Sequence, residues 1–309
     1  MGNPSFALPS LERLFKDNHK ILAVVTNPDK PAGRGRELRS SPVKSLAQSL
    51  GLTIFQPLKL SDEGLVETLL NLRPELFAIV AFRILPRGLL SIPSLGSVNL
   101  HASLLPKYRG AAPINWAIMN GESVTGVTTF FLKPRVDTGD ILKQREWPIA
   151  AGTTFGELYD QLSVIGAELL SETVEVISYG KAEAMAQSDE LASLAPKITT
   201  DFCRIDFGKP CKKVVDLVRG LSPRPGAFTF FRGKKVKILR ATIAGGGERR
   251  CCPGEMVVGS EKRGLLVTCM DGMVEILTIQ PEGKTAMSAL EFINGYHPHQ
   301  GEMVGDGGL

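Results

Sequence analysis

The sequence predicts two domains: an α/β domain built on a parallel sheet, followed by a small β barrel. Its 309 residues exceed what one hydrophobic core of ordinary size contains. Two continuous apolar runs, Ile21–Thr26 and Leu76–Phe82, indicate buried strands, and helical patterns at residues 41–50 and 64–72 alternate with them. After residue 204 short strand candidates follow one another between glycine-containing turns, which is typical of a barrel.

The other elements of the first domain follow in chain order. Residues 98–101 are predicted to form a third strand that ends in a turn, and residues 126–132 a further strand. An amphipathic helix is predicted at residues 155–177. We therefore expect an α/β domain at residues 1–180, a connector at residues 181–203 and the barrel at residues 204–309.

The C-terminal domain is strongly basic. Between Arg204 and Arg250, 13 Lys or Arg residues stand against three acidic ones, whereas the whole chain has a net charge of only +4. This asymmetry indicates a polyanionic partner, although a solvated basic face without a ligand remains the alternative. The strand candidates of this domain are residues 227–231, 235–243, 255–258, 264–269 and 273–280.

Composition argues against a membrane or secreted protein. The chain is 43% hydrophobic and 22% charged, and no apolar run approaches the roughly 20 residues that span a bilayer. The N-terminal residues lack the basic leader and long apolar segment of a secretory signal. Five cysteines without C-x-x-C spacing indicate reduced thiols and no zinc site. We expect a cytoplasmic monomer without a bound metal.

One strand end gathers side chains that carry chemistry. Asn99 and His101 are two residues apart, so both project from one face at the carboxyl end of the third strand, where α/β sheets bind ligands. A polar turn with Asp137 and Asp140 follows the next strand. An amide, an imidazole and a carboxylate suit direct group transfer to an amine. Two alternatives stay open: Ser103 as a nucleophile, although it lacks a G-x-S-x-G elbow, and a histidine without a catalytic task.

These residues also carry a resemblance. Asn99-Leu-His-Ala-Ser-Leu-Leu-Pro106, Arg109-Gly-Ala-Ala-Pro113, Gly126-Val-Thr128 and Asp137-Thr-Gly139 together resemble the formyltransferase domain of enzymes that use 10-formyltetrahydrofolate. The resemblance implies a Rossmann-like domain in which Asn99, His101 and Asp137 are catalytic and Asp140 structures the loop. It also implies that the folate contacts a turn formed by Ser103, Leu104, Leu105 and Pro106.

The opposite wall of the implied folate pocket departs from the family pattern. Family members carry V-A-Y-G-x-I-L-P, whereas residues 80–86 of this chain are one residue shorter and lack the tyrosine and the glycine. Phe82, Arg83 and Ile84 would form this wall. Arg83 would either face the glutamate tail of the folate or replace local turn packing.

Two further segments resemble the methionyl-tRNA formyltransferase family in particular. The loop at residues 27–39 resembles the insertion that approaches the tRNA acceptor stem. In the basic C-terminal domain, Ile205-Asp206, Val218–Gly220 and Ser222–Ala227 resemble the OB-like tRNA-binding domain. In the loop, Arg34 would enter a groove or pair with phosphate, while Lys30, Arg36 and Arg39 would steer phosphates. A loop that only aids solubility is the alternative. The implied tRNA contacts of the second domain are Arg219, Arg224, Lys234 and Lys235.

The resemblance implies that the chain transfers a formyl group from 10-formyltetrahydrofolate to the α-amine of methionyl initiator tRNA. The alternatives are a formyltransferase that acts on a sugar amine or another small amine, and a catalytically silent RNA-binding homologue. At the N-terminus, residues 1–7 resemble the glycine turn that follows the family's first strand, while that strand itself is missing. We therefore expect that the protein starts a few residues upstream; a divergent but complete N-terminus is the alternative.

Overall fold

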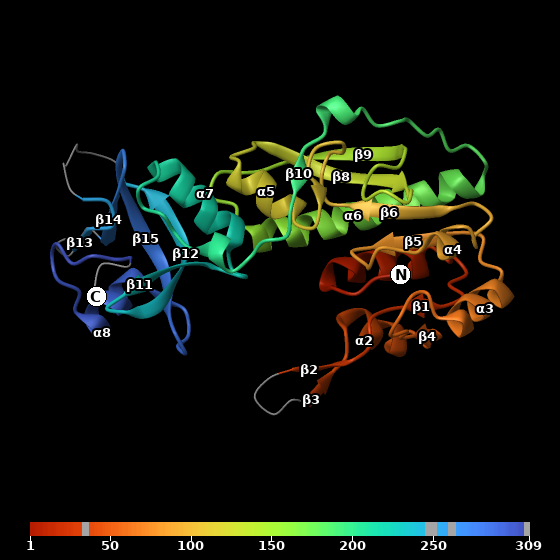
Figure 1. Cartoon of the computed structure of the whole chain (residues 1–309), viewed down its shortest axis with the longest axis horizontal. Helices are drawn as coiled ribbons and strands as arrows, with labels where there is room; N and C mark the ends of the chain where they lie inside the picture. The colour runs from red at the N-terminus through yellow and green to blue at the C-terminus, as the bar shows by residue number, and fades with distance from the viewer. Residues whose placement is uncertain (33–36, 245–251, 259–263, 306–309) are drawn as a thin grey trace. The chain divides into compact units, whose positions relative to one another are not determined.

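The computed structural model describes residues 1–32, 37–244, 252–258 and 264–305. The chain forms two compact units (Figure 1). Two short segments, Ile114–Ser123 and Ile149–Leu158, join the C-terminal unit although they interrupt the N-terminal one in sequence. Unit 1 comprises Met1–Pro113, Val124–Pro148 and Tyr159–Pro196, and unit 2 comprises Ile114–Ser123, Ile149–Leu158 and Lys197–Leu309.

The main sheet of unit 1 is mixed. Strand β5 (Phe77–Val80) runs parallel to β6 (Ser97–His101), as the apolar runs predict, whereas β8 (Val124–Phe131) and β9 (Ile141–Pro148) depart from the parallel expectation. Both are antiparallel to their neighbours. Along β9 exposed side chains alternate with less exposed ones, which an antiparallel edge strand tolerates and a parallel strand covered on both faces does not.

Helices cover the strands of unit 1. The longest, α6 (Phe155–Ser178), buries the leucine and isoleucine face predicted for it. No helix in the described part of the chain is long and apolar enough to cross a membrane. The other helices of unit 1 are α1 (Leu8–Lys16), α2 (Pro42–Ser49), α3 (Glu63–Leu72) and α4 (Arg87–Leu90), with 3-10 turns η1 (Ser5–Ala7) and η2 (Asp189–Leu191). Helix α5 (Pro113–Met119), except for its first residue, and the 3-10 turn η3 (Asp201–Cys203) belong to unit 2.

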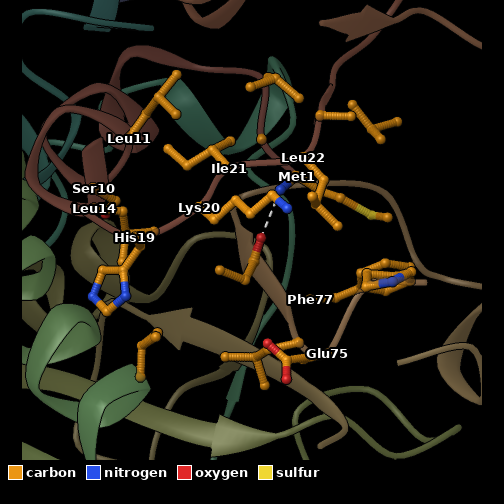
Figure 2. Close-up of a pocket in the computed structure, with 18 of the residues that line it drawn as sticks. Met1, Ser10, Leu11, Leu14, His19, Lys20, Ile21, Leu22, Glu75 and Phe77 are labelled. Atoms are coloured by element: carbon orange, nitrogen blue, oxygen red, sulfur yellow. Dashed lines mark hydrogen bonds between the residues drawn. The ribbon is translucent and has the colours of Figure 1, made fainter. Parts of the chain in front are cut away.

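The first two residues connect two parts of the sheet. The apolar run at residues 21–26 is a strand only at β1 (Val24–Val25), which pairs with β4 (Ile54–Phe55). Gly2 N donates to Val25 O at 3.1 Å, and Met1 N donates to Ala78 O of β5 at 2.6 Å. A cavity of about 560 Å³ lies beside this connection, and the residues that line it include Ile21, Leu22, Glu75 and Phe77 (Figure 2).

Unit 2 is a closed barrel. Its strands follow the order β11–β12–β15–β14–β13 and all pair antiparallel. Met303 forms a bridge with Glu255, directly before β13, and Val304 forms one with Phe231 of β11, so the two edges of the sheet are joined. The strands are β11 (Ala227–Phe231), β12 (Lys234–Ile243), β13 (Met256–Val258), β14 (Leu265–Cys269), β15 (Gly272–Pro281) and β16 (Met287–Ser288), accompanied by α7 (Cys211–Leu221) and α8 (Ala289–Tyr296).

Candidate functional site

Asn99 and His101 project from the carboxyl-terminal half of β6, as their spacing predicts. In the sheet, Asn99 stands opposite Phe130 and His101 opposite Thr128 on β8. His101 is 6% exposed. Its ring packs edge-on against that of Phe130, with 6.4 Å between centroids. The imidazole therefore lies in a largely dehydrated setting where charges interact more strongly than in water.

Backbone contacts fix the orientation of the His101 ring. Its Nε2 lies 2.9 Å from the carbonyl oxygen of Tyr108. Because a carbonyl only accepts hydrogen bonds, Nε2 carries the proton. Nδ1 faces Asp137 Oδ2 at 3.7 Å, and both side chains are more than 90% buried. Nδ1 is therefore the ring nitrogen that lies beside a carboxylate.

Asp137 lies in the loop between β8 and β9 and is positioned by its backbone. Its φ of 52° is left-handed, a conformation that costs a non-glycine residue roughly 1–2 kcal/mol. Gly110 N donates to its Oδ2 at 2.8 Å. At Gly139 a Cβ atom would lie 1.5 Å from Phe131 O, so only glycine fits this close approach. Asp140 accepts from Lys133 Nζ at 2.7 Å at the end of the loop.

Asn99 contributes an unused acceptor. Its Oδ1 is buried, and no donor in the described part of the chain reaches it. A buried polar atom without a partner costs about 1–3 kcal/mol, so a ligand that brings an N–H or O–H group to Oδ1 removes this cost. Asn99 and His101 are two residues apart on β6, so both side chains project from the same face of the sheet.

The turn after β6 is rigid. Ser103 is fully buried and its Oγ donates to Lys107 O at 2.7 Å, which leaves it unsuited to act as a nucleophile. Thr128 Oγ1 donates to Ser103 O at 2.6 Å and accepts from Leu105 N at 3.1 Å. Gln144 Nε2 donates to Leu105 O at 2.8 Å. Sequence reasoning missed Gln144, because β9 carries no apolar run that would have predicted it.

The segment proposed for the opposite wall of the folate pocket makes local contacts. Arg83 donates to the carbonyl oxygens of Leu58 and Pro57 at 3.0 and 2.9 Å, and its guanidinium lies over the ring of Phe82. Burial lowers the pKa of this guanidinium from its ordinary value. Of the two roles open to Arg83, these bonds support local turn packing. Phe82 is partly buried, whereas Ile84 is 74% exposed.

The basic loop of unit 1 begins and ends in a two-stranded hairpin, β2 (Lys30–Ala32) and β3 (Glu37–Arg39) (Figure 1). Lys30 and Arg39 are exposed and stand directly opposite each other in the register. Like charges in this position repel each other, so an anion between them would stabilise the hairpin. Arg34 and Arg36 lie outside the described residues.

The four residues of unit 2 that were predicted to contact tRNA differ in their contacts within the protein. Arg219 donates through Nε to Asp216 Oδ1 at 2.8 Å, and its side chain is 13% exposed, so this residue serves the packing of α7. Arg224 and Lys234 are exposed, and Lys235 Nζ lies 3.6 Å from the ring centroid of Phe228.

In the described part of the chain, no group of acidic, His or Cys residues could hold a metal ion.

Comparison with known proteins identifies the family. The formyl transferase model matches residues 1–174, and the model of the formyl transferase C-terminal domain matches residues 197–297. A methionyl-tRNA formyltransferase of Ruminiclostridium cellulolyticum is 42% identical over 307 residues, which cover 99% of this chain and 98% of that protein. The chain belongs to the methionyl-tRNA formyltransferase family. A relative of the same name in Geotalea uraniireducens is 43% identical over 99% of this chain and 96% of its own length.

Solved structures of formyltransferases share the fold. The sugar 3N-formyl transferase WlaRD, solved in the presence of dTDP and 5-N-formyl-THF, superposes with a TM-score of 0.66 at 19% identity, over 92% of this chain and 97% of that one. An N-formyltransferase from Helicobacter canadensis, in complex with folinic acid and dTDP-3-aminofucose, gives a TM-score of 0.65 at 20% identity, over 91% of this chain and 97% of its own. At these identities the likeness concerns the fold alone.

Proposed function

We propose that Asn99, His101 and Asp137 form the catalytic centre of this chain. As a member of its family, the chain transfers the formyl group of 10-formyltetrahydrofolate to the α-amine of methionyl initiator tRNA. The observation that carries the proposal is the pairing of the unused Asn99 oxygen with the imidazole beside a buried carboxylate. An attacking amine needs an acceptor that orients it and a base that takes its proton.

Each residue then has a distinct task in the transfer. The folate cosubstrate supplies an activated formyl group, and the neutral amine attacks its carbon. Asn99 Oδ1 accepts an N–H of the amine and aims its lone pair. His101 Nδ1 takes the proton that the nitrogen loses and returns a proton to the departing folate nitrogen. Asp137 stabilises the imidazolium between these two events, and the low local dielectric strengthens this attraction.

The basic surfaces would bind the tRNA. In unit 1, the facing Lys30 and Arg39 form a site of like charge that a phosphate would neutralise. In unit 2, the exposed Arg224 and Lys234 are available for phosphate contacts, whereas Arg219 is engaged with Asp216. Arg34 and Arg36, which lie between Lys30 and Arg39 in the sequence, are proposed as further tRNA contacts.

We further propose a cytoplasmic monomer. All three catalytic residues belong to unit 1 of one chain, so the site needs no second copy. The cysteines Cys203, Cys211, Cys252 and Cys269 are free thiols, which suits a reducing compartment. Light scattering after size exclusion tests the monomer, and a mass near 67 kDa, twice the 33.4 kDa of the chain, would argue against it. Cell fractionation tests the location.

One experiment tests the reaction and its acceptor. The protein is incubated with 10-formyltetrahydrofolate and, in parallel, with methionyl initiator tRNA or a dTDP-linked amino sugar. Formylated methionyl-tRNA is expected from the first incubation and no formylated sugar from the second. Formylation of the sugar alone would favour a sugar N-formyltransferase. Binding of tRNA without release of tetrahydrofolate would indicate a silent RNA-binding homologue.

A substitution tests the residues. Asp137→Asn keeps the side-chain volume but removes the charge beside His101, so kcat is expected to fall by about 100-fold or more. The KM for the tRNA should change little, because the buried Asp137 side chain offers little surface for a tRNA contact. Steady-state kinetics on protein with an unchanged thermal midpoint provides the measurement. Near wild-type turnover in such a protein would remove Asp137 from the mechanism.

A further inference from the structure

The connector at the end of unit 1 contacts the loop that carries Asp137. Gln187, in the segment before η2, lies 50 residues from Asp137 in sequence, yet its Nε2 donates to Asp137 O at 3.0 Å and to Gly139 O at 2.7 Å. Both hydrogens of one amide are thus bonded to backbone on either side of Thr138. This fixes the left-handed turn at Asp137 from outside the loop.

Arg109 in turn fixes the orientation of Gln187. Its Nε and Nη2 donate to Gln187 Oε1 at 3.0 and 2.8 Å, and its Nη1 donates to Asp189 Oδ1 at 2.7 Å. Arginine has no acceptor, so Oε1 must face Arg109 and the NH₂ group must face the two carbonyls. The Arg109 side chain is 8% exposed, and its hydrogen bond and charge lower the pKa of the Asp189 carboxyl.

A second set of backbone bonds joins the connector to the segment that contacts both catalytic side chains. Strand β10 (Leu194–Ala195) pairs parallel with β7 (Arg109–Gly110), and Ser193 Oγ accepts from Tyr108 N at 2.9 Å. The backbone carbonyl of Tyr108 accepts a hydrogen bond from His101, and the backbone amide of Gly110 donates one to Asp137. The connector therefore holds the His101 imidazole in place through the segment at β7, and the Asp137 carboxylate through Gln187.

We propose that Gln187 is a positioning residue for formyl transfer, held by Arg109, which sets the distance between the Asp137 carboxylate and His101. It touches neither reacting atom and acts by holding the Asp137 loop. This inference rests on the proposed catalytic role of Asp137. An error of about 1 Å in such a contact can cost about 100-fold in rate, so the geometry matters well beyond the strength of two hydrogen bonds.

Gln187→Met tests the proposal, because methionine keeps the length of the side chain and removes its hydrogen bonds. We expect kcat to fall about tenfold or more, with KM for both substrates within about threefold and a changed pH dependence of kcat. Gln161→Met is the matched control, since this exposed amide of α6 only accepts from Trp147. Gln187→Glu keeps both bonds from Arg109 and loses the donors, so it gives the same test if the Met variant does not fold.

The outcomes separate this proposal from the proposed function. A folded Gln187→Met protein with kcat within twofold of wild type would overturn the positioning role, and so would a loss that appears mainly in KM or leaves the pH profile unchanged. Asp137→Asn is assayed beside it. If that variant keeps wild-type turnover, the catalytic assignment fails; if it is inactive while Gln187→Met is active, only the positioning role fails.

Discussion

In a chain that begins at Met1, the amino group of this residue provides a prediction that can be worked from the structure. This group is buried between β1 and β5, and loss of hydration lowers its pKa from 8.0 to about 5 (Figure 2). In the unfolded chain at pH 7 the group is mostly protonated, whereas in the folded chain it is neutral. Folding must therefore release a proton, and the chain becomes more stable as pH rises from 5 to 8.

Acetylation of Met1 removes this cost. The acetylated nitrogen still donates one N–H to Ala78 O but carries no charge to bury. With 1.36 kcal/mol for each pKa unit, the gain in the free energy of unfolding is about 1.4 kcal/mol at pH 7, about 4 kcal/mol at pH 5 and near zero above pH 9. For a domain of this size, the value at pH 7 corresponds to about 3–6 °C in Tm.

The assay compares thermal midpoints of the free and acetylated chains from pH 5 to pH 9, after intact mass has confirmed that Met1 is the first residue. A difference that shrinks as pH rises is expected. A difference independent of pH, or no difference at pH 5, would refute the buried amine. Mass is essential because a chain that begins elsewhere presents a different amino group.

Extension of the N-terminus tests the cavity itself. The backbone groups of Val25 and Ala78 face residues 1 and 2 from opposite sides. Because backbone groups alternate along a strand, those of Ala23 and Leu76 face the space ahead of Met1 in the same way. A Val-Ile-Val-Phe extension is expected to pair there and bury apolar side chains. A Gly-Ser-Gly-Ser extension removes the charge equally, so it is the matched control. Equal midpoints for the two would show that no strand fits.

Three further predictions concern single residues. Gly139→Ala places Cβ against Phe131 O, so it is expected to lower Tm by several degrees or prevent folding, as measured by thermal melts; an unchanged Tm would contradict the close approach. Lys30→Ala removes the repulsion with Arg39, so it should leave Tm unchanged or higher and reduce the salt dependence of tRNA binding by about one unit, while an unchanged slope would exclude a phosphate contact. Arg219→Ala should destabilise unit 2 by about 1–3 kcal/mol in denaturant unfolding, because it removes one of the two cations that pair with the buried Asp216 carboxylate and leaves only Lys212; a neutral effect would refute the packing role.

Local patterns in the sequence predicted much of the site. Alternation along a strand is a local property, and it placed Asn99 and His101 on one face at the end of β6. What the sequence could not provide are the contacts that orient the His101 ring and the Asp137 carboxylate. The carbonyl of Tyr108 and the amide of Gly110 are backbone groups that every residue possesses, so no residue type marks them. Gln187 reaches its partners only because the chain folds back along β7.

The number of basic residues in the C-terminal domain did not show which of them are free to bind a partner. Arg219 and Arg224 lie five residues apart in the basic stretch and looked equivalent in the sequence. The structure pairs Arg219 with a buried carboxylate one helical turn away, whereas Arg224 is exposed between two prolines. A basic segment therefore predicts the sign of its partner from its net charge, but the residues that bind the partner are those without an internal acidic contact.

Two residues with left-handed backbone conformations contact the proposed catalytic histidine. Tyr108 and Asp137 have positive φ values, of 62° and 52°. Each costs a non-glycine residue about 1–3 kcal/mol, and such conformations persist only where neighbouring contacts over-determine them. Here those contacts come from the connector, through β10 and Gln187. A connector that only linked two domains would not need hydrogen bonds to the backbone near the end of β6, yet this one makes them. Its bonds make the geometry around His101 depend on residues some 50 to 90 positions away, so mutations in the connector should act on turnover before they act on folding.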